Sequence, residues 1–425
     1  MNDLEKKVLN VIDENWESEV HFLRGLIQRP SILGNEAVVQ NFISRHLADM
    51  GLEVDHWEVD HGEISKEPYY SPVEWSYEGR PVVVSTWHAA EGGGRSLILN
   101  GHVDVVPVGA ENQWSYDPWG GEVESGRMYG RGAGDMKAGV AAMIYAVKAL
   151  KESGINLRGD VILETVIEEE CTGNGTLATI ARGYRGDAAI IPEPSKQAVL
   201  ESHVGVMWVR VTVRGLGAHA NSASDSANAI LKACDLIRAV KELEEQVNVL
   251  EERPSLYKSL QHPLNYNVGT ITAGDWTSSV PSECTFTVRI SAFPGADLDQ
   301  VQTQFKSFLL EAASKDEWLS KNLPEISFYA FRADGCTISR HQPIMATLNR
   351  SHQRVTGRDV EIHTETATSD MRVFNQYGIP ATWYGPIAGN LHAPDEWVDL
   401  ESLRETTKVL ALAVMDWCGV SFKNY

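Results

Sequence analysis

The order of strands and helices changes twice along the chain, and this is the strongest constraint on its fold. Up to residue 203 the sequence alternates apolar strands with helices, which is typical of a largely parallel sheet covered by helices. Between residues 204 and 332 the order becomes strand-helix-strand-strand-helix-strand, a ferredoxin-like α+β unit. The sequence therefore predicts an α/β domain formed by residues 1–203 and 333–425, interrupted by an inserted α+β domain at 204–332.

Hydrophobic periodicity places the individual elements. We expect amphipathic helices at 3–29 and 36–51, a mostly buried helix at 135–154 and a C-terminal helix at 400–418. Expected strands of the α/β domain cover 97–103, 161–168, 187–191 and 379–385. In the inserted domain, strands are expected at 204–215, 265–276, 283–295 and 325–335, with helices at 227–246 and 297–315.

The charge balance excludes several classes of partner. The chain has 58 acidic and 37 basic residues and a formal net charge of -21. Nucleic acids and anionic membranes bind basic surfaces, so we expect neither as a partner. There is no signal-peptide pattern and no apolar run that could span a membrane, and the five cysteines are scattered without a C-x-x-C spacing. We expect a cytoplasmic protein that acts on a small molecule.

A histidine or a carboxylate follows each predicted parallel strand. Functional groups of open parallel sheets gather at the carboxyl ends of the strands, so these side chains are expected to meet. The set is His102, Asp135, Glu168–Glu170, Glu193 and His392. Imidazoles and carboxylates without thiolates suit zinc, cobalt or manganese, and the set exceeds what one tetrahedral ion needs. The sequence predicts two divalent ions, zinc before the other metals, that share a bridging carboxylate.

Asp104 follows His102 by two residues in the stretch LILNGHVDVVPVG. Residues two apart on a strand point to the same face. We therefore expect the Asp104 carboxylate to accept the second ring N–H of His102 and to fix its tautomer. A single histidine at a strand end is more often structural, and the other groups at the strand ends are what favour a ligand role for His102.

Six segments, in order, resemble a known family. GHVDVVP, GRGAGDMKAG, EEECTGNGT, PEPS, GLGAHA and HAPDEW are similar to motifs of the dinuclear metallohydrolases that include acetylornithine deacetylase, succinyl-diaminopimelate desuccinylase, aminoacylase and bacterial glutamate carboxypeptidase. The resemblance implies that His102 and Glu193 bind one metal, and that Glu170 and His392 bind the other. Asp135 would bridge the two.

The resemblance also implies roles outside the ligand set. Glu169 would be the general base. His219, in the inserted domain, would stabilise an oxyanion in its own subunit or in a partner's. Arg289, Asn267 and Ser279 would contact the substrate, and Arg289 suits a substrate carboxylate, with a structural ion pair as an equal alternative. The inserted domain would serve as a lid and as the contact of a homodimer.

Three positions depart from the family pattern. Glu168 stands where an aspartate is usual, which leaves the adjacent base and ligand in place. Ser279 stands where asparagine is frequent, and TATSDMRVF replaces a commoner Gly-Gly-Thr-Asp pattern. Because the last two fall in regions of substrate contact, the usual substrates are in doubt.

We expect a metal-dependent hydrolase of an amide C–N bond in a small molecule. The leading expectation is deacylation of an N-acyl amino acid or N-acyl amine by a hydroxide that bridges the metals. The alternatives are a dipeptidase or carboxypeptidase, and a hydrolase of an atypical substrate such as an N-formyl heterocyclic amine or an aromatic amine that loses its amino group. A catalytically silent binding or scaffold homologue is disfavoured, because all ligands and the base are present.

Overall fold

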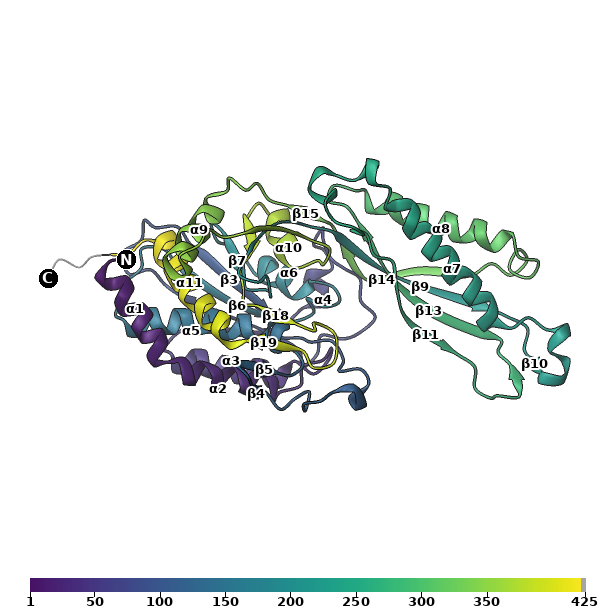
Figure 1. The fold of residues 1–425 in the computed structure, drawn as a ribbon, viewed down its shortest axis with the longest axis horizontal. Helices are drawn as coiled ribbons and strands as arrows, with labels where there is room; N and C mark the ends of the chain where they lie inside the picture. Colours follow the sequence, from purple (N-terminus) through teal and green to yellow (C-terminus); the bar gives the residue numbers. More distant parts are fainter. Residues whose placement is uncertain (422–425) are drawn as a thin grey trace.

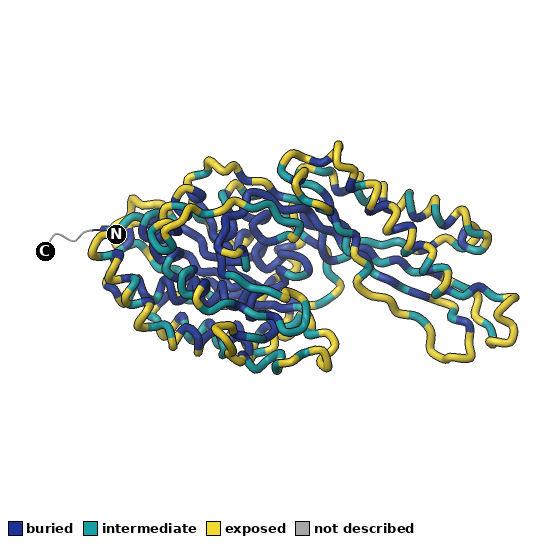
Figure 2. The backbone as a smooth tube through the Cα atoms, in the orientation of Figure 1, coloured by how far each residue is buried: buried dark blue, intermediate teal, exposed yellow. Residues whose placement is uncertain are grey.

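The computed structural model describes residues 1–421 and shows two bodies (Figure 1). The larger body contains the N-terminus and the end of the described chain, and the smaller body projects from its opposite side. Buried residues fill the larger body and form a thinner layer in the smaller one (Figure 2). Within residues 1–421, no helix has both the length and the apolar character that crossing a membrane requires.

The larger body is built on a six-stranded, mainly parallel sheet, which confirms the predicted α/β class. Its strand order is β1-β2-β6-β3-β7-β17, in which β6, β3, β7 and β17 are parallel neighbours and β2 is antiparallel to both of its own. The strands are β1 (Glu53–Glu58), β2 (Pro81–Trp87), β3 (Leu97–His102), β6 (Val161–Val166), β7 (Ala189–Ile191) and β17 (Ala381–Trp383). The antiparallel strands β1 and β2 were not predicted.

Helices cover this sheet. They are α1 (Asp3–Glu14), α2 (Trp16–Ile27), α3 (Ala37–Asp49), α4 (His61–Ile64), α5 (Ala138–Glu152), α6 (Asn174–Ala181), α9 (Pro343–Thr356), α10 (Met371–Gln376) and α11 (Leu400–Cys418). Helix α5 packs on β3 and also contacts α1, α2 and α11, so nearly all of its side chains are buried, as the apolar sequence predicts.

Two predicted helix boundaries are wrong. The helix expected at 3–29 is two helices, because Asn15 ends α1 and precedes α2. The buried helix expected from Asp135 begins its regular α-helical part only at Ala138. Asp135 itself has φ -116° and ψ 98°, which are not helical angles. A carboxylate freed from the helix in this way can face the carboxyl ends of the strands.

The smaller body is a four-stranded antiparallel sheet with two helices, in the order expected of a ferredoxin-like unit. Its strand order is β11-β13-β9-β14. The elements are β9 (Gly205–Arg214), α7 (Ala229–Val247), β11 (Asn267–Ala273), β13 (Glu283–Ala292), α8 (Leu298–Ser314) and β14 (Glu325–Ala333). Its apolar core, which includes Val209, Leu236 and Phe286, is separate from the core of the larger body.

Short strands complete the structure and were beyond sequence prediction, since two to five residues show no clear period. One small sheet has the order β15-β8-β16, another β18-β19-β5-β4, and β10 pairs with β12. They are β4 (Glu122–Glu124), β5 (Arg127–Tyr129), β8 (Val199–His203), β10 (Ala218–His219), β12 (Ser279–Val280), β15 (Cys336–Thr337), β16 (Ile362–Glu365), β18 (Ala388–Gly389) and β19 (Trp397–Asp399).

Candidate active site

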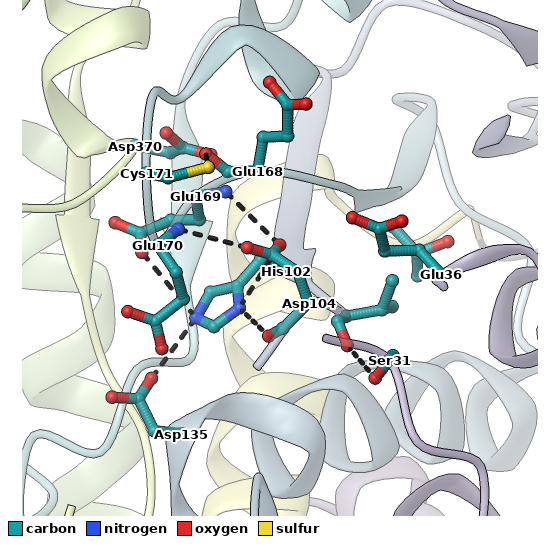
Figure 3. Close-up of polar contacts among 12 residues, drawn as sticks. Ser31, Glu36, His102, Asp104, Asp135, Glu168, Glu169, Glu170, Cys171 and Asp370 are labelled. Atoms are coloured by element: carbon teal, nitrogen blue, oxygen red, sulfur yellow. Dashed lines mark hydrogen bonds and ion pairs between the residues drawn. The ribbon is translucent and has the colours of Figure 1, made fainter. Parts of the chain in front are cut away.

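The loops that follow the parallel strands bring the predicted ligands together (Figure 3). His102 is the last residue of β3 and is buried. Its Nε2 lies 3.8 Å from Oε1 of Glu193, which follows β7, and 3.9 Å from Oε2 of Glu169, which follows β6. Segments far apart in the sequence therefore meet around one imidazole, because parallel strands end at a common edge.

Asp135 lies between the two histidines of the cluster. Its Oδ1 is 3.2 Å from Nε2 of His102, and its Oδ2 is 3.4 Å from Nε2 of His392. His392 Nε2 is also 3.1 Å from Oε1 of Glu170. One carboxylate facing two separate imidazoles with its two oxygens is the arrangement that a shared ligand of two ions needs.

The loop before α5 directs Asp135 into this position. Gly132 has φ +81°, a backbone conformation that favours glycine. The backbone N–H groups of Gly134 and Asp135 donate to Oε1 of Glu396, at 2.9 and 3.0 Å, and the Asp135–Met136 peptide bond is cis. Glu396 is buried and belongs to the HAPDEW segment. The sequence analysis did not single it out, although its motif was noted.

Asp104 makes different contacts from those expected. The Nδ1 of His102 donates to the backbone carbonyl of Asp104 at 2.9 Å, and the nearest carboxylate oxygen is 3.7 Å away. The carboxylate instead accepts the backbone N–H groups of Glu169 and Glu170, at 3.2 and 3.1 Å. Since a carbonyl only accepts, His102 carries its hydrogen on Nδ1 and presents Nε2 to the cluster. Asp104 thus holds the turn that carries Glu169 and Glu170.

Glu168 points into a separate buried network. Its carboxylate accepts from Trp75 Nε1 at 2.6 Å and Tyr77 Oη at 3.2 Å, and it pairs with Arg80 Nη1 at 2.5 Å. The same guanidinium pairs with Glu36 at 2.6 Å. Glu168 has φ +66°, which turns the chain immediately before the two residues of the cluster. A glutamate in place of the usual aspartate is therefore fully paired and does not disturb its neighbours.

Residues 72–80, whose side chains hydrogen-bond to Glu168, also contact the smaller body. The carbonyl of Pro72 accepts the backbone N–H of Ala330, in β14, at 3.0 Å. Glu74 pairs with Arg210, in β9, through two hydrogen bonds of 3.0 and 2.9 Å. Residues 72–80 therefore contact both the turn at Glu168 and the inserted sheet.

Carboxylates crowd the cluster. Burial, reinforced by the charges of its neighbours, raises the pKa of Glu169 well above its ordinary value, and the same causes raise the pKa of Glu193. Asp135 responds in the opposite direction: burial is outweighed by the two histidines, and its pKa falls below its usual range. The charge of Glu170 raises the pKa of His392 to about 11. The raised pKa values of Glu169, Glu193 and His392 reflect an excess of negative charge, which divalent cations would also offset.

The donor set fits metal ions. Ligand atoms of His102, Asp135 and Glu170 lie within 4.8 Å of one another, and so do those of His102, Glu169 and Glu193. The two groups share His102, and the second contains the expected base Glu169. Oxygen and imidazole donors in two adjoining groups suit a pair of borderline divalent ions.

A cavity of about 600 Å³ runs from the cluster to the inserted domain. One row of side chains crosses the inserted sheet along its wall: Asn267, Arg289, Trp208 and Tyr329 are cross-strand partners on β11, β13, β9 and β14, and all line the cavity. Directly paired residues share a face of the sheet. The Trp208 ring lies 5.5 Å from Phe331 and 5.8 Å from Tyr329. The cavity thus joins polar groups to an aromatic wall.

Sequence comparison assigns the family. The sequence model of peptidase family M20/M25/M40 matches residues 98–416, which is more than half of the chain. The chain belongs to peptidase family M20/M25/M40. It is accordingly a metal-dependent hydrolase that acts on carbon–nitrogen bonds, as the motifs predicted, and the family binds two metal ions.

Relatives of this M20 chain include two curated enzymes that match it over nearly its full length. The N-formyl-4-amino-5-aminomethyl-2-methylpyrimidine deformylase of Bacillus subtilis (strain 168) is 29% identical over 440 residues, which cover 98% of this chain and 97% of that protein. The enzyme of the same name from Halalkalibacterium halodurans is 28% identical over 444 residues, covering 97% of each.

Solved M20 structures share the fold. The di-peptidase Dug1p of Saccharomyces cerevisiae has a TM-score of 0.77 and 14% identity, covering 97% of this chain and 98% of that one. Human carnosine dipeptidase 1 has a TM-score of 0.76 and 16% identity, covering 97% and 99%. At these identities the likeness concerns the fold alone.

Some predicted residues of the M20 chain lie apart from the cluster. His219 and Ser279 are cross-strand partners on the β10–β12 ribbon, both are exposed, and neither lines the cavity. Figure 1 places β10 at the end of the inserted domain that is remote from the larger body. Within one chain, His219 therefore does not reach the cluster. The sequence showed the histidine but not where its ribbon would lie.

Arg289 lines the cavity without an acidic partner among residues 1–421. Its guanidinium donates to Ser291 Oγ at 2.7 Å and to the carbonyl of Thr366 at 3.1 Å. Burial lowers the pKa of Arg289 to about 10. The structural ion pair left open by the sequence is thus absent from the described chain. Trp208 and Tyr329, which share its row, were missed because a strand pattern does not reveal which face meets a cavity.

Proposed function

We propose that this chain is a dinuclear metallohydrolase that removes a formyl or other short acyl group from a primary amine carrying an aromatic ring. The observation that carries the proposal is the cavity that joins the carboxylate–histidine cluster to the Trp208 wall. The deformylase relatives support the same choice, since the substrate in their name is an N-formyl amine on a pyrimidine ring. This was one of the alternatives raised by the sequence.

We assign the metal ligands as the motifs imply. His102 and Glu193 would hold one ion, Glu170 and His392 the other, and Asp135 would bridge them, with zinc as the proposed metal. When bound, such ions polarise an acyl oxygen and lower the pKa of water from 15.7 toward about 7. The contacts of Asp135 with both histidines support this division.

The chain itself supplies positioning and proton transfer. Glu169 would accept a proton from the attacking water and return it to the leaving nitrogen, so that the products are a carboxylic acid and a free amine. Asp104 holds the backbone N–H of Glu169, which fixes the base relative to His102. Burial of the cluster keeps bulk water from competing for that proton.

Residues 204–332 would form a lid and a dimer contact. His219 and Ser279 are presented on a ribbon far from their own cluster, so we propose that His219 acts in a partner's cavity as an oxyanion donor. The free cysteines of the described chain agree with a reducing compartment, and we propose the cytoplasm.

A second candidate is an N-acyl amino acid or a dipeptide. Arg289 favours it, because a guanidinium in the cavity without an acidic partner among the described residues could bind a substrate carboxylate.

A substrate panel with metal-reconstituted protein tests the choice. We expect release of formate from N-formyl (4-aminopyrimidin-5-yl)methylamines to exceed hydrolysis of N-acetyl and N-succinyl amino acids and of dipeptides. Faster hydrolysis of the carboxylate-bearing compounds would establish the second candidate. Reconstitution in parallel with zinc, cobalt and manganese decides the metal, and sedimentation at micromolar concentration decides the dimer.

A further inference from the structure

One carboxylate in the cavity lies outside the histidine–carboxylate cluster. Glu365 is the last residue of β16, where it pairs in register with His203 of β8, and it lines the cavity. Among residues 1–421, its side chain accepts no hydrogen bond and forms no ion pair. The basic residues of the cavity, Lys196 and Arg289, leave it unpaired, so Glu365 is available to a ligand.

The backbone beside Glu365 is fixed from the inserted domain. Arg289 Nη2 donates to the carbonyl of Thr366, the next residue, at 3.1 Å. Arg289 is also the cross-strand neighbour of Trp208. The backbone next to Glu365 and the Trp208 position are therefore both neighbours of one guanidinium, and both residues line the same cavity.

The aromatic wall suits a flat ring. Trp208 has Phe331 edge-on at an interplanar angle of 74° and Tyr329 tilted at 57°. All three line the cavity. Aromatic rings bind other π systems by stacking and attract cationic groups over their faces. A wall of this kind with one free acceptor selects a planar ligand that donates hydrogen bonds.

We propose that Glu365 and Trp208 form the subsite of the leaving amine and recognise an amidine-like heteroaromatic ring, of which 4-aminopyrimidine is the type. A carboxylate only accepts. A 4-aminopyrimidine that takes a proton from solvent at N3, the ring nitrogen next to the amino-bearing carbon, offers two parallel N–H donors, from the ring and from the amino group, which match the two oxygens of Glu365. A benzene ring offers neither. The inference rests on the proposed function and goes beyond it by naming the residues that bind the amine part of the substrate.

Two N-formyl amines that differ only in the ring edge provide the test. One carries 4-amino-2-methylpyrimidin-5-ylmethyl and the other benzyl. For the wild-type zinc-loaded protein we expect kcat/KM to favour the pyrimidine by about 100-fold, because only the pyrimidine donates hydrogen bonds to the carboxylate of Glu365. Glu365→Gln should lose about 10- to 100-fold on the pyrimidine and stay within about twofold on the benzyl compound. The unchanged benzyl activity shows that the variant is folded.

Glu361→Gln is the matched control. Glu361 lies just before the same strand, is exposed, pairs with His363 and does not line the cavity. It should match the wild type on both compounds. Glu365→Asp, which keeps the charge, should retain part of the preference. Equal efficiency of the wild type on both rings, or an equal effect of Glu365→Gln on both, would overturn the inference while leaving deformylation in place.

Binding of the product amine separates the two proposals. Calorimetric titration of the zinc-loaded protein with 5-aminomethyl-4-amino-2-methylpyrimidine should show affinity that Glu365→Gln weakens by about tenfold or more. If neither N-formyl compound is hydrolysed but this loss is seen, the proposed function fails and the subsite stands. If neither turnover nor Glu365-dependent binding occurs, both fail.

Discussion

The two walls of the cavity are built differently. On the larger body, His102, Asp104 and Glu169 are almost fully buried; His102 Nδ1 donates to the carbonyl of Asp104, and the Asp104 carboxylate accepts the backbone N–H of Glu169. On the inserted domain, Trp208 and Arg289 are half-buried side chains on one face of a sheet whose other face carries the apolar core. The first wall can change only by disturbing the fold. The second can change residue by residue, so the proposed reaction chemistry and the proposed substrate choice would reside in separable parts of the chain.

The largest effect should come from the first wall. Replacing Glu169 by glutamine removes the proposed proton acceptor and should lower kcat by about 10³-fold, with two equivalents of metal retained. His392→Ala should lose metal as well as turnover, because it removes a proposed metal ligand. Elemental analysis of both purified variants checks the contrast. Equal metal loss in the two would mean that the roles are wrongly assigned.

Stability should be lost when a buried charge loses its partner. Arg80→Met leaves Glu36 and Glu168 buried without a counter-ion and should destabilise the larger body by about 3–5 kcal/mol in urea unfolding. Arg210→Met breaks an exposed pair with Glu74 and should change stability by less than about 1 kcal/mol. Similar losses in both variants would show that burial does not distinguish the two regions.

A third effect depends on pH. Glu19, in α2, is fully buried beside Thr407, and burial raises its pKa from 4.5 to about 8. Between these values the unfolded chain releases a proton that the folded chain keeps, so this group lowers stability as pH rises. Glu19→Gln removes that dependence. Its stability relative to the wild type should rise from pH 5 to pH 8 by on the order of 2 kcal/mol. If the difference in stability between Glu19→Gln and the wild type is the same at both pH values, the buried, protonated state of Glu19 is contradicted.

The smallest effect belongs to the second wall. Trp208→Leu should lower kcat/KM for ring-bearing substrates by about tenfold, or about 1.4 kcal/mol, with little change in the unfolding midpoint. Val209 is the adjacent residue on the covered face of β9 and is fully buried in the inserted core. Val209→Ala should therefore lower the unfolding midpoint and leave kcat/KM nearly unchanged. Comparable losses of stability would mean that the two faces of this sheet are not independent.

The sequence predicted those features that hydrophobic periodicity and the order of strands and helices determine. Alternating residues in 204–215 fixed β9, and the return of alternation after the insertion indicated the interrupted domain. It did not predict β1, an edge strand with an exposed side that lacks the apolar run of β3, nor β2, although β2 lies inside the sheet and carries the apolar run Val82–Val84. The histidine and carboxylates at the ends of β3, β6 and β7 had been singled out by type and position, whereas Glu365 at the end of β16 had not. The hydrogen-bond partners of the residues singled out were not predicted: the contacts of Asp104 with Glu169 and Glu170 depend on the path of a turn, which residue types alone do not specify.

The residues of the cavity wall outside the cluster were the hardest to foresee. Arg289 came from the family resemblance, whereas Trp208 and Glu365 had no signal, since each belongs to an ordinary strand pattern. Only the packing of the inserted sheet against the larger body shows that they share a cavity.

Residues 72–80 connect the two bodies, in addition to the chain crossings at 203–205 and 333–335 and the hydrogen bond from Arg289 to the carbonyl of Thr366. Their N-terminal part is bound to β14 and β9, and their C-terminal part grips the carboxylate that precedes the proton acceptor. A swing of the inserted domain must therefore either break the exposed Glu74–Arg210 pair or pull on the turn at Glu168. Under the proposed roles, the orientation of the inserted domain and the position of Glu169 are coupled through residues 72–80, and the exposed Glu74–Arg210 pair is the contact in this path that breaks most easily.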